Sequence, residues 1–122
     1  MKYAIDWRKS IRMQYKIRIT DLAEKDLEDI GDYIAYELLN GDAAINTIKG
    51  IRKKINDLKY FPERNELDED SFLAELGVRM DYYRNYKIYY VIDKREQIVY
   101  IVRILHMLVD SRTWLYRTFK TE

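Results

Sequence analysis

Two apolar stripes with helical spacing, joined by only a few residues, constrain this chain more than any other feature of its sequence. In the first stripe, apolar residues recur in steps of three or four: Ala23, Leu27, Ile30, Ile34 and Leu38. The second stripe follows the same rule: Ala44, Ile48, Ile51, Ile55 and Leu58. Such spacing is that of one face of an amphipathic helix. Because the break at Asn40-Gly41 is short, the two helices are predicted to form an antiparallel hairpin.

Polar and turn residues mark the ends of these helices. Asp21 is predicted to cap the first helix, with Glu24 three residues later as its partner in a capping box. Asp42 is the corresponding candidate for the second helix. Phe61-Pro62 ends the second helix, because proline lacks the N–H group that a helix interior requires.

Period-two alternation, which is typical of a half-buried strand, occurs once before the helices and three times after them. The predicted strands cover residues 15–20, 78–83, 86–92 and 97–105. The acidic stretch 63–76 is predicted to be an exposed connection with room for a short helical turn. These elements predict an α+β fold of order β-α-α-β-β-β, in which an N-terminal strand and a helical hairpin accompany a curved antiparallel β-sheet. The hairpin is expected to cover one face of the sheet, and function is expected on the other.

Length and composition fit one globular domain and exclude several classes of protein. Residues 14–122 are predicted to form a single domain with a short C-terminal segment, and residues 1–13 an N-terminal extension. The chain has no cysteine, which excludes a disulfide scaffold, a Cys-ligated zinc finger and a thiol enzyme, and favours a cytoplasmic location. The sequence contains no signal peptide, membrane span, Gly-rich phosphate loop or metal-binding motif, so no cofactor, metal or membrane association is expected.

The net charge of +1 argues against a nucleic-acid-binding domain, but the charge is unevenly distributed. Residues 1–20 carry six basic and one acidic residue, and residues 77–122 carry nine and five. The first helix and the connection at 63–76 hold most of the acidic residues. Basic residues and tyrosines alternate on the predicted strands, a mixture that suits nucleotide stacking and phosphate neutralisation. Tyrosine is equally a favoured strand residue with no binding role, and both readings stay open.

The C-terminal half carries the most specific pattern in the sequence. Behind the two helices and the Phe61-Pro62 break come Gly77-Val78-Arg79, the pattern Tyr-x-Ile-x-Tyr-x-Ile at 86–92, and Val-x-Ile-x-Arg-Ile-Leu-His at 99–106. In this order they resemble the RelE/ParE superfamily of toxins from bacterial type II toxin-antitoxin modules, over residues 14 to about 115. The resemblance implies a small growth-inhibiting toxin of helices packed on a sheet, neutralised by a cognate antitoxin with which it forms a hetero-oligomer.

The superfamily divides by target, and the resemblance implies different residues for each branch. RelE-like members cleave mRNA in the ribosome without a metal, and Lys87, His106 and Arg112 match the basic residues that this chemistry needs. ParE-like members share the fold and inhibit DNA gyrase without a ribonuclease site. Met107-Leu108-Val109-Asp110 after the histidine, Trp114 where a tyrosine is expected, and the low net charge depart from the ribonuclease pattern. The sequence therefore favours gyrase as the target over ribosome-bound mRNA.

Several further residues are candidates for contacts with a target or a partner: Arg79, Arg84, Tyr86, Arg103 and Trp114. The arginines could instead pair with the acidic first helix and the connection, in which case they are structural. The lone His106 could likewise be a hydrogen-bonded structural residue. A third possibility for the whole chain is a non-catalytic, degenerate family member that only binds a partner.

Overall fold

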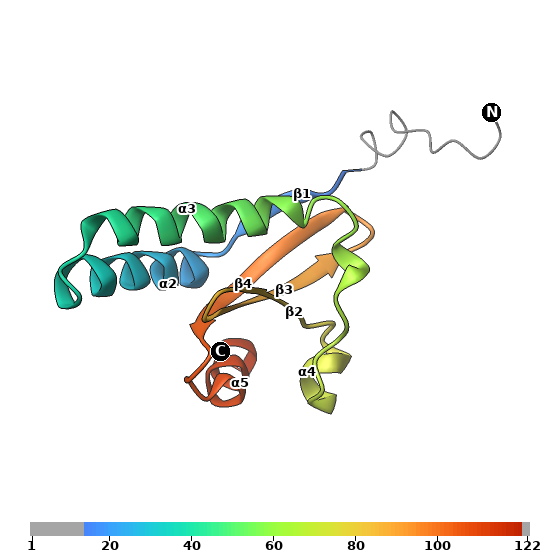
Figure 1. The fold of residues 1–122 in the computed structure, drawn as a ribbon. Coiled ribbons are helices and arrows are strands. Elements are labelled where there is room, and N and C mark those ends of the chain that lie inside the picture. Colours follow the sequence, from blue (N-terminus) through green and yellow to red (C-terminus); the bar gives the residue numbers. More distant parts are fainter. Residues whose placement is uncertain (1–13, 121–122) are drawn as a thin grey trace, which may run out of the picture.

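The computed structural model describes residues 14–120, in which a strand, the helical hairpin and three further strands follow one another in the predicted order (Figure 1). The strands are β1 (Lys16–Ile19), β2 (Arg79–Tyr83), β3 (Tyr86–Asp93) and β4 (Ile98–His106). The helices are α2 (Asp21–Asp32), α3 (Gly41–Asp57), α4 (Ser71–Glu75) and α5 (Ser111–Lys120). A π-helical turn, η1 (Tyr33–Glu37), extends α2, and a 3-10 turn, η2 (Pro62–Arg64), follows α3. The predicted α+β class, the short helix within 63–76 and the C-terminal segment are thus confirmed.

The hairpin of α2 and α3 begins each helix with a side-chain cap that differs from the prediction. Thr20 Oγ1 accepts a hydrogen bond from the backbone N–H of Ala23 at 3.2 Å. Asn40 Oδ1 accepts one from the N–H of Ala43 at 3.0 Å. The prediction of Asp21 and Asp42 as caps was wrong, because both residues already lie inside the helices. Their carboxylates lie in the first turn, where negative charge interacts favourably with the helix dipole and stabilises the helix.

The four strands form one sheet of order β1-β4-β3-β2. β2, β3 and β4 form the predicted antiparallel meander, but β1 pairs with β4 in parallel, so the sheet is mixed rather than wholly antiparallel. Figure 1 shows the reason: α2 continues in the direction of β1, and α3 returns the chain to the end of the sheet where β1 began. β2 therefore starts in the same direction as β1, and two further reversals leave β4 parallel to β1.

Each face of the sheet has its own apolar core. The hairpin face buries side chains from α2, α3, β3 and β4, among them Leu27, Ile51, Ile88 and Ile104. The other face packs Tyr89, Val102 and Leu105 against α4 and α5, whose buried residues are Leu73 and Leu115. The face on which function was expected is therefore partly covered by two short helices.

A β-bulge separates the two halves of the β3–β4 pairing. Tyr90 lies opposite Ile101 and Tyr89 lies opposite Arg103, so Val102 is the extra residue on β4. An extra residue shifts the in-and-out alternation of a strand by one position. Beyond the bulge, even-numbered residues of β4 such as Ile104 face the hairpin, whereas before it odd-numbered residues such as Val99 do.

Within residues 14–120, no helix is long and apolar enough to cross a membrane. The predicted N-terminal extension, residues 1–13, lies outside the described residues.

Candidate functional site

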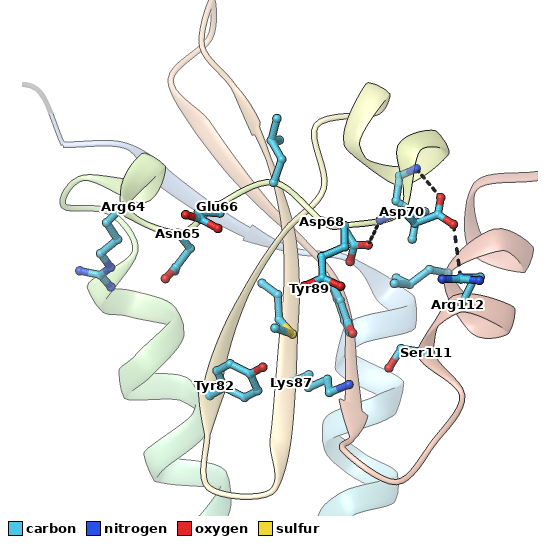
Figure 2. Close-up of a pocket in the computed structure, with 15 residues that line it drawn as sticks. Arg64, Asn65, Glu66, Asp68, Asp70, Tyr82, Lys87, Tyr89, Ser111 and Arg112 are labelled. Atoms are coloured by element: carbon cyan, nitrogen blue, oxygen red, sulfur yellow. Dashed lines mark hydrogen bonds and ion pairs between the residues drawn. The ribbon is translucent and has the colours of Figure 1, made fainter.

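A cavity of about 540 Å³ opens on the sheet face opposite the hairpin, between the loop before α4, strands β2 and β3, and the start of α5 (Figure 2). Met80, Tyr82 and Tyr89 come from the strands, and Leu73 and Leu115 from the two short helices. The charged side chains of the lining are Arg64, Glu66, Asp68, Glu69, Asp70, Lys87 and Arg112. Carboxylates therefore outnumber cations in this cavity.

Two of the three predicted catalytic residues, Lys87 and Arg112, meet in this cavity. Lys87 extends from β3 beside Tyr82, its partner across the β2–β3 pairing, and Figure 2 shows its amine pointing toward Ser111 of α5. The side-chain amine of Lys87 has no hydrogen-bond or ion-pair partner among residues 14–120. It is a partly buried ammonium group that remains available to an anion.

Arg112 is already engaged in a network that ties α5 to α4. Its Nε lies 3.3 Å from Asp70 Oδ2, and the Tyr116 hydroxyl donates to the same carboxylate at 2.9 Å. Asp70 also caps α4 by accepting a hydrogen bond from the N–H of Leu73 at 3.1 Å. The Leu73 N–H, with help from Tyr116 and Arg112, holds the pKa of the Asp70 carboxyl below its ordinary value.

His106, the third predicted catalytic residue, lies on the other face of the sheet. It pairs with Tyr86 at the end of β4, and the two rings meet edge to face with centroids 5.4 Å apart. Tyr86 packs against the hairpin core, and burial raises the pKa of its phenol. Nδ1 of His106 accepts a hydrogen bond from the N–H of Leu108 at 3.1 Å. Consecutive residues of a strand point to opposite faces, so Lys87 and the Tyr86–His106 pair are separated by the sheet.

Arg103 and Trp114, predicted as contact residues, belong to one intramolecular cluster. Two nitrogens of Arg103 bind the two oxygens of Asp26 at 2.7 and 2.8 Å, and a third lies 3.3 Å from the hydroxyl of Thr118. The Arg103 guanidinium also lies 5.3 Å from the ring centroid of Trp114, which is 41% exposed. This cluster joins α2, β4 and α5.

The remaining predicted contact residues, Arg79 and Arg84, have different surroundings. Arg79 donates to the backbone carbonyl oxygens of Glu63 and Asn65, so it fixes the loop that forms one wall of the cavity. Arg84 is exposed in the β2–β3 turn, where its guanidinium lies 5.2 Å from the ring centroid of Tyr83. Of the predicted contact residues, Arg84 and Trp114 are the exposed ones.

The structure also brings in residues that the sequence analysis did not single out. Asp70 and Tyr116 organise the α4–α5 side of the cavity, and Asp26 holds Arg103. No local sequence motif predicts these pairs, because Asp70 and Tyr116 lie 46 residues apart and Asp26 and Arg103 lie 77 residues apart. In the described part of the chain, no group of three or more His, Cys, Asp or Glu side chains could hold a metal ion.

Comparison with solved structures places this fold in one class. The toxin-antitoxin system ParDE from P. aeruginosa contains a chain that is 17% identical, with a TM-score of 0.64, over 77% of this chain and 97% of that one. A RelBE toxin-antitoxin complex from Mycobacterium tuberculosis matches with 21% identity and a TM-score of 0.56, over 76% and 98% of the two chains. A mutant of the toxin RelE from E. coli in the free state matches with 13% identity and a TM-score of 0.58, over 83% and 92%. At these identities the likeness shows the fold, which is that of the RelE/ParE toxin superfamily.

A match to a family model assigns the chain to one family within this superfamily. The model of the ParE toxin of the type II toxin-antitoxin system parDE matches residues 17–110, which is more than half of the chain. The chain therefore belongs to the ParE toxin family of type II toxin-antitoxin systems. No curated protein matches it closely enough to count as a relative.

Proposed function

We propose that this toxin inhibits growth by acting on DNA gyrase and that it does not cleave RNA. The observation that carries the proposal is the separation of Lys87 from His106 by the sheet. Cleavage at a ribose 2′-hydroxyl needs a proton acceptor and a proton donor within hydrogen-bond reach of one substrate. Groups on opposite faces of a sheet do not meet that requirement.

The charge of the cavity supports the same proposal. Glu66, Asp68, Glu69 and Asp70 line it beside the cations, and Arg112 is already paired with Asp70. A single unpaired ammonium among carboxylates gives a weak field for a polyanion such as mRNA. A protein target is compatible with such a mixed lining.

The test of the gyrase proposal uses the purified full chain with gyrase and relaxed plasmid. We expect loss of supercoiling and accumulation of cleaved DNA, with ribosome-bound mRNA left intact in a parallel reaction. In cells, induced expression with separate readouts of DNA, RNA and protein synthesis should show that DNA synthesis fails first. An arrest of translation with intact DNA synthesis would overturn the proposal.

The second candidate function is ribosome-dependent mRNA cleavage, and one observation favours it. Lys87 and Arg112 line the same cavity, with Tyr82 and Tyr89 available to stack on bases. If this is the activity, Lys87→Ala with Arg112→Ala abolishes mRNA cleavage, and His106→Ala, on the far face, leaves it unchanged. Loss of cleavage in the single variant His106→Ala would instead show that His106 takes part in catalysis.

We further propose that a cognate antitoxin forms a hetero-oligomer with this chain in the cytoplasm and covers the cavity face and α5. The solved neighbours from P. aeruginosa and M. tuberculosis come from toxin-antitoxin systems, which supports such a partner. Co-expression with the small protein encoded beside this gene should abolish growth inhibition and yield a stable complex. A chain that never inhibits growth, even without that protein, would be a non-catalytic binding module instead.

A further inference from the structure

An apolar groove of about 540 Å³ lies where the chain enters β1 and adjoins the candidate site through Arg64, which lines both. The loop that follows α3 and the turn η2 form most of it, and Tyr15 lies opposite them. The residues of the loop and of η2 that line it are Lys59, Tyr60, Phe61, Pro62, Glu63 and Arg64. Most of the surface that the groove presents is apolar, unlike that of the charged cavity. Surface depressions of this kind are common sites for an apolar side chain of a partner segment.

Phe61 lines this groove, and its backbone has an unusual conformation. Its backbone has φ of 54°, the left-handed region, and its side chain is 74% exposed. A bulky residue pays a steric cost in this region, and a position before proline normally adopts an extended conformation. Pro62 is nevertheless fixed, because its carbonyl oxygen accepts a 2.6 Å hydrogen bond from the buried hydroxyl of Tyr90. The fold therefore holds an aromatic ring in solvent beside an apolar depression.

The chain itself supplies a segment that starts at this groove. The N–H of Tyr15 donates to the carbonyl oxygen of Lys59 at 3.0 Å, so the point of entry is fixed against the groove wall. Thirteen residues precede Gln14 in the sequence, and they include six large apolar residues: Met1, Tyr3, Ile5, Trp7, Ile11 and Met13. Trp7 is eight residues before Tyr15, a separation of up to about 26 Å of extended chain, which is ample for a return onto the groove. A tether this short gives the segment a high effective concentration at the groove.

We propose that the groove of Tyr15, Tyr60, Phe61 and Pro62 is the docking site of this chain's own N-terminal segment, residues 1–13, with Trp7 as the anchoring side chain. Tryptophan has the largest apolar surface in the segment, and Phe61 and Tyr60 offer ring faces for it. Docking would cover the exposed ring of Phe61. The proposal is independent of the target of the toxin.

The test uses the fluorescence of Trp7 in the full chain. The chain has two tryptophans, so Trp114→Phe leaves Trp7 as the only indole emitter. We expect Trp7 to emit at shorter wavelength than in the urea-unfolded chain and to resist iodide quenching. Adding Phe61→Ala should shift the emission to longer wavelength and remove the protection.

Tyr36→Ala is the matched control, because Tyr36 is as exposed as Phe61, at 74%, and lies on the helical hairpin. It should leave Trp7 emission unchanged. Far-UV circular dichroism and urea titration check that each variant is folded, and Tyr60→Ala replaces Phe61→Ala if the latter is not. Emission of native Trp7 equal to that of the unfolded chain would overturn the proposal. Protection that disappears on dilution would also overturn it, since the occupant would then come from a second copy.

Discussion

The guanidinium of Arg103 joins three elements inside the fold. Both members of the pair with Asp26 are mostly buried, with side-chain exposures of 10% and 11%. Asp26 also accepts a hydrogen bond from the N–H of Ile104 at 2.9 Å, so its carboxylate is fixed by side chain and backbone together. Removing one partner of a buried pair leaves the other charge uncompensated, which is costlier than losing an exposed pair.

We predict that Arg103→Ala lowers the free energy of unfolding by about 3 kcal/mol or more. The matched control is Arg52→Ala, which removes a 2.9 Å ion pair with Glu24 whose members are both 48% exposed. That variant should lose less than about 1 kcal/mol. Urea titration followed by circular dichroism measures both, and equal losses would show that burial of the Arg103 pair is unimportant.

Gly50 permits close contact between α3 and the β2–β3 hairpin. A Cβ atom built on Gly50 would lie 2.1 Å from the ring of Tyr83, whereas one on Gly31 would meet Ile48 at an ordinary 3.5 Å. Glycine in a helix is otherwise about 1 kcal/mol less favourable than alanine.

We therefore predict opposite signs for two substitutions in thermal unfolding. Gly31→Ala should raise the midpoint, because it gains helix propensity without a clash. Gly50→Ala should lower it, because the Tyr83 ring must move, at a cost of about 1–3 kcal/mol. Gly50→Ala combined with Tyr83→Ala should recover part of the loss. A rise in midpoint for Gly50→Ala alone would contradict this contact.

At the scale of elements, the carboxylate of Asp70 joins α5 to α4 by polar contacts, in addition to the packing of the Phe72 and Tyr116 rings. Because the pKa of Asp70 is lowered in the folded protein, chiefly by the Leu73 N–H, the charged form stabilises the fold. This stabilisation is present above the unfolded-state pKa of about 3.9 and is lost as the pH falls through the lower pKa of the folded state.

We predict that Asp70→Asn is less stable than the unmodified chain at neutral pH and that the difference shrinks as the pH falls below about 4. Tyr116→Phe should show the same trend with smaller amplitude, since it removes one of the bonds to Asp70. Urea midpoints measured between neutral and acidic pH provide the test. A difference that stays constant with pH would mean that the Asp70 charge does not stabilise the α4–α5 contact.

In the molecule as a whole, the two faces of one sheet pack into two separate hydrophobic cores. Leu27 is buried on the hairpin face and Leu115 on the α5 face, and β3 and β4 contribute side chains to both cores. Two cores that share their strands should unfold together.

We predict that Leu27→Ala and Leu115→Ala each lower the stability by about 2–5 kcal/mol within a single transition. Far-UV circular dichroism should report the helical hairpin, and Trp114 emission in a Trp7→Phe background should report α5. The two signals should coincide in both variants. A separate early transition of Trp114 in Leu115→Ala would show that α5 is an independent unit.

Local periodicity in the sequence was enough to predict the helices and the strands. Helical spacing from Ala23 to Leu58 specified the hairpin, and alternation after Gly77 specified the three strands, because each pattern records which side of an element is apolar. The resemblance carried by residues 86–92 and 99–106 was confirmed by the family to which the chain belongs. The α+β class and the order of elements followed from these signals.

The packing of distant elements against one another became visible only in the folded structure. The parallel pairing of β1 with β4 depends on where α3 returns the chain, which no local pattern contains. The extra residue Val102 reverses the alternation of β4, so His106 faces the hairpin while Lys87 faces the cavity. Without that bulge, strict alternation would have placed both on one face, because the side chains of a strand repeat every two residues. A single unpaired residue in the sheet thus separates two side chains that the sequence had grouped as one site.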